Sequence, residues 1–148
     1  MNLNEKSKEI YKNNQLKGFW TYREAIPLTM KECGLFSDEE IKSVQDATKA
    51  QLLMLIVSEA AEVLEANRGR TNILNREKFT RTAELYPSDE LWKNNFEENI
   101  KNSEEDEIAD IIIRCLDYCG GFNIDIDWHI EQKIKYNKLR EKLHSKKY

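Results

Sequence analysis

Two pairs of acidic residues lie inside apolar stretches of the sequence, and the two members of each pair are three positions apart. Glu59 and Glu62 belong to a leucine-rich stretch, whereas Glu107 and Asp110 begin an isoleucine-rich one. On an α-helix this spacing places both carboxylates of a pair on the same face. Carboxylates that face an apolar interior are costly unless something compensates their charge. Four converging acids cannot neutralise one another, but a divalent cation can bind them together.

The neighbours of the first pair indicate which face of the helix it occupies. The residues on this stripe are Leu52, Leu55, Ile56, Glu59, Glu62 and Val63. Because apolar residues share the stripe, we expect the two acids to point where the core residues point. A single Glu-x-x-Glu pair is more commonly a solvated helix face with salt bridges, but two acidic pairs on apolar helices favour a metal site.

The chemistry of the predicted donors indicates which ion the site would take. Every donor is a carboxylate oxygen and neither motif contains histidine, which favours Mg²⁺, with Mn²⁺ as a substitute, over zinc or iron. Two nearby ions can activate a water molecule and stabilise the leaving oxygen of a displacement at phosphorus. We therefore predict that the same four residues bind metal and carry catalysis: Glu59, Glu62, Glu107 and Asp110.

A basic segment late in the sequence complements the acids. Lys133, Asn137 and Arg140 have the spacing of one helix face. Such a face suits a polyphosphate substrate, since metal ions can hold one side of the phosphate chain while lysine and arginine hold the other. The alternative is a solvated helix with a lysine-rich tail.

The aromatic residues Phe19 and Trp20 follow Lys17-Gly18 and allow two interpretations. They can attach the first helix to the rest of a bundle by apolar packing. Alternatively, they can form a wall against a base or sugar, because aromatic faces stack on nucleobases. In the second interpretation Trp20 is a substrate-binding residue.

The composition predicts an all-α fold. A chain of 148 residues with five glycines and two prolines is expected to form one domain over 1–148, a helical bundle with two metal-binding helices. Ser37 with Glu40 and Ser103 with Asp106 are helix-capping signals. We expect helices over 4–16, 37–67, 88–101, 104–119 and 126–143, a break at Pro27, irregular structure over 70–87, and an end to the fourth helix at Gly120-Gly121.

Several classes of protein are disfavoured by the same sequence. The net charge of −4 argues against a stable complex with nucleic acid. No apolar run approaches the length of a membrane span, and the first residues are polar rather than those of a signal peptide, so we expect a cytoplasmic protein. The three cysteines, Cys33, Cys115 and Cys119, are interpreted as structural thiols of a reducing compartment.

Taken together, these motifs resemble those of the MazG-like nucleoside triphosphate pyrophosphohydrolases, part of the all-α NTP pyrophosphatase superfamily. That superfamily has Glu-x-x-Glu on one helix, Glu-x-x-Asp on a later one, and then a segment bearing lysine and asparagine. The corresponding segments here are 55–66, 107–113 and 133–140, continuing to His144 and Lys147, and Lys17-Gly18-Phe19-Trp20 resembles a feature of phage-like and related bacterial members. Each motif is weak alone, but their order is fairly specific.

The resemblance implies an activity and an assembly. The reaction would be hydrolysis between the α- and β-phosphates of a nucleoside triphosphate, ribo or deoxyribo, giving a nucleoside monophosphate and pyrophosphate. The four acids would hold Mg²⁺, one of the glutamates could activate the water, and Lys133, Asn137 and Arg140 would hold phosphate or sugar oxygens. The resemblance also implies that a homodimer or homotetramer completes the site.

Two features depart from the expected pattern. The segment 70–103, between Glu62 and Glu107, is a long insert that could be a lid, an oligomer contact or a specificity element. Its apolar side chains include Trp92 and Phe96, one turn apart, which we expect to pack near the mouth of the site or against a second subunit. In addition, Arg140 is followed by glutamate where many relatives have proline.

Two other functions compete with the hydrolase. A di-iron carboxylate bundle needs Glu-x-x-His on two helices, but this chain has the motif once, from Glu141 to His144 in the basic tail. A non-catalytic helical module that binds nucleotide or a partner protein would carry the acids as a degenerate site.

Overall fold

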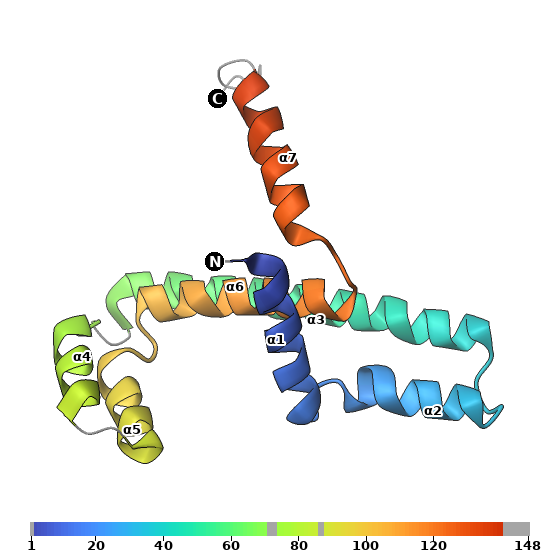
Figure 1. Cartoon of the computed structure of the whole chain (residues 1–148), viewed down its shortest axis with the longest axis horizontal. Helices are drawn as coiled ribbons and strands as arrows, with labels where there is room; N and C mark the ends of the chain where they lie inside the picture. Colours follow the sequence, from blue (N-terminus) through green and yellow to red (C-terminus); the bar gives the residue numbers. More distant parts are fainter. Residues whose placement is uncertain (1, 71–73, 86–87, 141–148) are drawn as a thin grey trace.

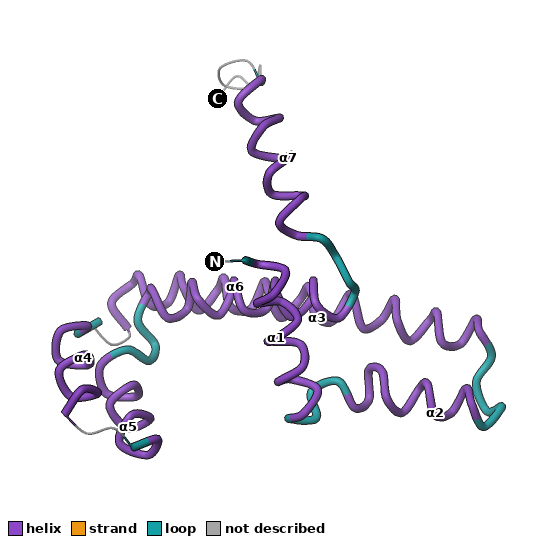
Figure 2. Tube along the Cα trace, in the orientation of Figure 1, coloured by secondary structure: helices purple, strands orange, loops and turns teal. Residues whose placement is uncertain are grey.

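The computed structural model describes residues 2–70, 74–85 and 88–140, and within these ranges every regular element is a helix, which confirms the all-α prediction (Figures 1 and 2). The elements are α1 (Leu3–Leu16), a π-helical turn η1 (Thr21–Ala25), α2 (Ile26–Glu32), α3 (Asp38–Glu65), a π-helical turn η2 (Ala66–Arg70), α4 (Arg76–Leu85), α5 (Asp89–Asn99), α6 (Glu104–Gly121) and α7 (Ile126–Leu139). None of the described helices has the length and apolarity needed to cross a membrane.

The longest helices, α3 and α6, lie side by side in opposite directions and form the centre of the fold (Figure 1). The predicted capping signals start both of them. The backbone N–H of Ser37 donates to the Glu40 carboxylate at 2.7 Å, and the Ser37 hydroxyl accepts from the Glu40 N–H at 3.3 Å. The Ser103 hydroxyl accepts from the Asp106 N–H in the same way. The Ser103 cap fixes where the first turns of α6, which carry the acids, begin.

Helix α1 crosses α6 where α6 contains two consecutive glycines. A Cβ on Gly120 would lie 2.4 Å from the backbone oxygen of Ser7, and one on Gly121 would lie 2.2 Å from the Trp20 ring. The predicted end of this helix at Gly120-Gly121 is confirmed, because α6 ends at Gly121, two residues after the expected 119. The two glycines also allow α1 and Trp20 to pack closely against α6, which the sequence did not indicate.

The Trp20 indole fills the space beside this crossing and is only 4% exposed. Its Nε1–H donates to the buried Asp117 carboxylate at 3.1 Å. The rings of Tyr11 and Phe122 meet it edge to face, with centroids 4.9 and 6.0 Å away. The indole thus joins α1 to α6, as the packing interpretation of this residue predicted.

Two helical segments were not anticipated. Pro27 does not break the chain, because it lies in the first turn of α2, where a missing N–H costs nothing. The segment 70–87 is not irregular, because α4 forms within it and pairs with α5. Short helices of low apolarity depend on tertiary partners, and the Phe79 ring of α4 meets the rings of Trp92 and Phe96 at 5.7 and 6.2 Å.

This α4–α5 hairpin also supplies a partner for the stripe on α5 that the sequence did not indicate, whereas its packing near the site mouth or against a second subunit stays a prediction. Trp92 and Phe96 stack on each other at 5.3 Å and find their partner in Phe79, within the insert itself. The Asn95 side chain donates to the Phe79 carbonyl at 2.8 Å, and the Asn75 N–H donates to the Asn99 carbonyl at 2.9 Å. The hairpin is therefore held together by its own contacts.

Helix α7 extends away from the α3–α6 pair (Figures 1 and 2) and packs mainly against the start of α1. The two helix beginnings cap each other. The Asp127 carboxylate accepts from the N–H groups of Leu3 and Asn4 at 3.2 and 2.9 Å, and the Asn4 side chain accepts from the Ile126 N–H at 2.9 Å. The predicted end of this helix at 143 lies outside the described residues, as do Glu141, His144 and Lys147.

We predict that Gly120→Ala destabilises the protein by about 1–3 kcal/mol, because a methyl group cannot fit against the α1 backbone. An exposed helical glycine would instead gain stability on the same change, by about 1 kcal/mol of helix propensity. Chemical denaturation of the variant measures the difference. An unchanged or higher free energy of unfolding would show that the two helices can separate at this point without loss.

Candidate metal centre

Three of the four predicted acids meet between α3 and α6. Glu59, Glu107 and Asp110 each offer a carboxylate oxygen, and these oxygens all lie within 4.8 Å of one another. Glu59 and Glu107 are buried, at 7% and 5% exposure, and Asp110 is half-buried. We call these three residues the acid cluster.

The antiparallel packing of the two helices explains why these residues meet. Glu59 lies near the end of α3, and Glu107 and Asp110 lie in the first two turns of α6. Because the helices run in opposite directions, the end of one lies beside the beginning of the other (Figure 1). Leu52 of α3 and Leu116 of α6 are buried as well, so both helices bury apolar residues in addition to the acids.

Glu62 is placed differently from the other three acids. Its side chain is exposed, and it does not belong to the acid cluster. It is nevertheless close enough for its charge to be the largest carboxylate influence on the pKa of Glu107, after burial. Glu62 therefore lies on the solvent side of the cluster.

The charges of the cluster oppose one another. Burial raises the pKa of Glu107, and so do four neighbouring carboxylates, in decreasing order Glu62, Asp106, Asp110 and Glu59. Burial likewise raises the pKa of Asp110, with Asp106 as its strongest carboxylate neighbour. A raised carboxyl pKa means that burial and the neighbouring carboxylates disfavour the negative charge of these two residues, so a bound cation would stabilise their ionised forms.

Two neighbours of the cluster were missed in the sequence. Arg114 donates its Nε–H to Glu59 at 2.9 Å and lowers the pKa of Asp110. Asp106 acts on both Glu107 and Asp110 through its charge. The signal that could have found them is spacing, because Asp106 and Arg114 lie one turn before and one turn after Asp110 on α6.

The donor set fits a hard divalent cation. All three groups are carboxylates, and two oxygens on opposite sides of Mg²⁺ are about 4.2 Å apart, given Mg–O distances of about 2.1 Å. The 4.8 Å span of the acid cluster is only slightly wider, so side-chain rotations could close it. Mg²⁺ commonly takes one or two carboxylates and keeps other positions for water and phosphate. Glu59 would have to share its carboxylate with Arg114 or release it.

The predicted basic residues do not join the acids within one chain. Lys133, Asn137 and Arg140 are all exposed on or just after α7, which points away from the α3–α6 pair (Figure 1). The Lys133 ammonium and the Arg140 guanidinium lie over the Tyr136 ring, 5.3 and 5.6 Å from its centroid. These cations are thus held beside an aromatic ring on α7.

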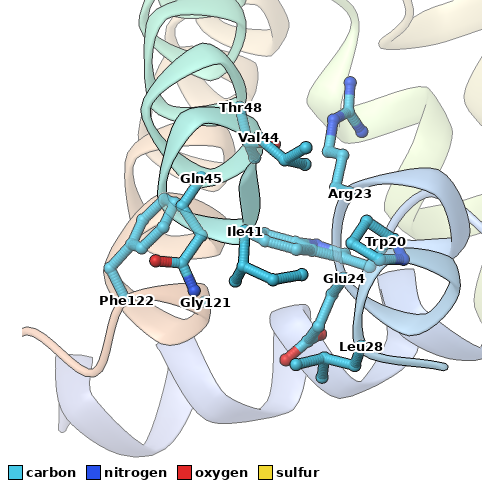
Figure 3. Close-up of a pocket in the computed structure, with 11 residues that line it drawn as sticks. Trp20, Arg23, Glu24, Leu28, Ile41, Val44, Gln45, Thr48, Gly121 and Phe122 are labelled. Atoms are coloured by element: carbon cyan, nitrogen blue, oxygen red, sulfur yellow. The ribbon is translucent and has the colours of Figure 1, made fainter. Parts of the chain in front are cut away.

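Trp20, the fourth predicted substrate contact, lies toward the other end of α3. It lines a cavity of about 280 Å³ between η1, the first half of α3 and the end of α6, together with Glu24, Ile41 and Phe122 (Figure 3). Thr48 on the cavity wall is eleven residues before Glu59, which corresponds to about 16 Å along the helix axis. The structure therefore separates this cavity from the acid cluster by several helical turns.

Comparisons of the chain with protein-family models, with curated protein sequences and with solved structures gave no match. The resemblance of the motifs to the MazG-like pyrophosphohydrolases therefore stays a prediction, and a function has to be argued from the site itself.

The raised pKa of Glu107 predicts how the metal-free protein responds to pH. A carboxyl group with a raised folded-state pKa holds its proton more tightly when folded, so its contribution to stability is present below its unfolded pKa of about 4.3 and is lost as the pH rises through the folded value. Without metal, Glu107→Gln should therefore gain stability over the wild type near pH 7 and lose this advantage near pH 4.

Melting temperatures in a chelator across this pH range measure the effect. The matched control is Glu105→Gln, which neutralises an exposed carboxylate in the same first turn of α6. If the melting temperatures of the wild type and Glu107→Gln change with pH in parallel, the charge of Glu107 does not destabilise the folded protein.

Proposed function

We propose that the chain is a Mg²⁺-dependent nucleoside triphosphate pyrophosphohydrolase, which hydrolyses ribo- or deoxyribonucleoside triphosphates to the monophosphate and pyrophosphate. The observation that carries this proposal is the acid cluster, three carboxylates from two helices within 4.8 Å, with the pKa of Glu107 and of Asp110 raised. Such repulsion destabilises the folded protein unless something compensates the charge. A cation would compensate it, and its free coordination positions could bind phosphate.

In this proposal Glu59, Glu107 and Asp110 hold Mg²⁺, which when bound polarises phosphate oxygens and makes a coordinated water more acidic. Glu62 is exposed beside the acid cluster rather than within it, so it has a different role. In this proposal Glu62 orients the attacking water and accepts its proton. Arg114 supplies a positive charge beside Glu59 and can hold a phosphate oxygen when Glu59 turns toward the metal.

The proposal includes a second copy of the chain. Large apolar side chains on α3 and α6 are about half exposed, namely Leu53, Met54, Val57, Ile108, Ile112 and Ile113. Apolar surface of this kind on neighbouring helices favours a protein interface. Since α7 of one chain extends away from its own acids, we infer that Lys133, Asn137 and Arg140 reach the acid cluster of a partner in a dimer or tetramer.

One observation favours the non-catalytic module as a second candidate. The 2.9 Å ion pair between Arg114 and Glu59 satisfies one carboxylate of the cluster without any metal. In a degenerate site this pair would be permanent, and the module would bind nucleotide or a partner without turnover. A pyrophosphate-release assay distinguishes the two candidates.

We predict that nucleoside triphosphates release pyrophosphate in the presence of Mg²⁺ or Mn²⁺, and that excess EDTA abolishes the release. Asp110→Asn removes a metal ligand and Glu62→Gln removes the proton acceptor, so each should lower kcat by a factor of at least about 100. Asp46→Asn neutralises an exposed carboxylate elsewhere on α3 and should leave the rate unchanged. The readouts are pyrophosphate release and circular dichroism, which checks that each variant folds.

Full turnover in EDTA would refute the metal mechanism. Near-normal turnover in both acid variants would mean that the site lies elsewhere. Nucleotide binding without release by the wild type would favour the module.

The α4–α5 hairpin gives a separate prediction. Because it is held by its own contacts, replacement of the segment 72–101 by a short Gly/Ser linker should leave the acid cluster in place. The Trp92 and Leu91 side chains are about half exposed, so the hairpin still offers apolar surface to a ligand or a subunit. We expect changes in KM, substrate preference or assembly that exceed any change in the Kd for Mn²⁺.

Steady-state kinetics, light scattering and Mn²⁺ titration of the deletion variant test this expectation. A folded variant with the same assembly and the same substrate profile would show that the hairpin has no part in function.

A further inference from the structure

Arg114 forms an ion pair with one carboxylate of the acid cluster and leaves the other two without such a pair. Its Nε–H donates to Oε1 of Glu59 at 2.9 Å. Glu107 and Asp110 accept no side-chain hydrogen bond from any group in the described part of the chain, although Glu107 is only 5% exposed. The cluster therefore holds one carboxylate that a protein cation neutralises and two that remain uncompensated.

The buried carboxylate of Glu107 points to a missing cation rather than to a finished core. A buried carboxylate without a hydrogen-bond partner is costly, and such groups in folded proteins are usually paired or coordinate a metal. The oxygen that Glu107 offers lies within 4.8 Å of those of Glu59 and Asp110. A cation placed among the three would compensate Glu107, which Arg114 does not contact.

The guanidinium of Arg114 has donors to spare. Arginine carries five N–H donors, and the bond to Glu59 uses one of them. Its two Nη groups have no partner among the described residues, and its side chain is 38% exposed. Arg114 lies four residues after Asp110 and seven after Glu107, so it shares their face of α6. A phosphate bound at the acid cluster would therefore be within reach of paired guanidinium donors.

Arg114 and a divalent cation compete for Glu59. With a metal–oxygen distance of about 2.1 Å, an ion on the paired oxygen of Glu59 would lie within about 5 Å of the Arg114 Nε. Two positive charges this close repel each other, and more strongly in a half-buried site than in water. Metal binding therefore favours release of Arg114, and a ligand that takes Arg114 favours metal binding. By linkage the two effects are equal in free energy.

We propose that Arg114 is an internal counter-ion that couples metal binding at the acid cluster to phosphate binding. In the free protein it neutralises Glu59. In the complex it donates to a phosphate oxygen of the nucleoside triphosphate, while Glu59 is released to bind Mg²⁺. The free protein would then hold Mg²⁺ weakly, and the site would fill with metal mainly when substrate is present. The inference rests on the proposed function, because a polyphosphate is the ligand that brings phosphate oxygens to the acid cluster.

The first test is a Mn²⁺ titration of the metal-free full-length protein without nucleotide, followed by electron paramagnetic resonance. Arg114→Met and Arg114→Gln both remove the competing charge, so we expect their Kd for Mn²⁺ to be at least about fivefold lower than that of the wild type. Arg114→Lys keeps the charge and should stay within about twofold of the wild type. Arg68→Met is the matched control, because Arg68 is an exposed arginine that pairs with Glu65 just beyond the cluster. It should change the Kd less than about twofold.

The second test measures nucleotide binding at saturating Mg²⁺. Isothermal titration is carried out with the α,β-imido analogues of ATP, GTP, CTP and UTP, and the analogue that the wild type binds most tightly is used for the variants. In Arg114→Met its Kd should rise by at least about tenfold, because the paired phosphate contact is lost. The signature of the coupling is this opposite response, tighter metal and weaker nucleotide. Circular dichroism and melting temperatures in a chelator show whether each variant is folded.

The outcomes separate this inference from the proposed function. Unchanged or weaker Mn²⁺ binding in the Met and Gln variants would show that Arg114 only holds Glu59 in position. Equal tightening in Arg68→Met would show a general effect of charge, and unchanged nucleotide binding would show that Arg114 does not contact phosphate. Each of these results overturns the coupling and leaves the proposed function standing.

Two further outcomes bear on the proposed function itself. The opposite response in Arg114→Met without any pyrophosphate release by the wild type supports the coupling and overturns the hydrolase. Absence of Mn²⁺ binding in the wild type and in all variants overturns both.

Discussion

The packing of α3 against α6 is the constraint on which the rest of the structure depends. The two helices bring Glu59 beside Glu107 and Asp110, and apolar residues such as Leu52 and Leu116 supply the burial that offsets their repulsion. The pKa of Glu107 and of Asp110 is raised as a result. A cation bound at this place would relieve the repulsion, so in the proposed function stability and chemistry are coupled through one helix pair.

Local sequence signals predicted much of this arrangement. The capping residues Ser37 and Ser103 set the beginnings of α3 and α6, and the three-residue spacing predicted that Glu107 and Asp110 meet in one cluster. The same spacing did not predict that Glu62 is exposed beside the cluster while Glu59 is buried in it. What the sequence did not reveal depends on contacts between distant residues. The close approach of the α1 backbone to Gly120 cannot be predicted from the glycine itself, and α4 has the sequence of an irregular segment because its helix depends on the contact of the Phe79 ring with α5. The pairing of Arg114 with Glu59 joins two helices and has no local signature beyond its spacing from Asp110.

The position of helix α7 is set by polar contacts rather than by an apolar face. Asp127 caps the beginning of α1, and Asn4 caps the beginning of α7. In the described part of the chain its cations lie apart from the acid cluster, and in the proposed assembly the exposed apolar side chains of α3 and α6 would contact a second copy. In the proposed assembly one chain supplies the metal ligands and another supplies the phosphate contacts, so activity would depend on association.

A titration of the metal-free protein with Mn²⁺, followed by electron paramagnetic resonance, tests most directly whether the acid cluster binds a divalent cation. Free Mn²⁺ gives a strong signal that is lost on binding, so the titration yields both stoichiometry and Kd. We predict saturable binding at neutral pH with Mg²⁺ as a competitor, and at least tenfold weaker binding in Asp110→Asn. Binding that is absent in the wild type, or equally tight in the variant, would contradict it.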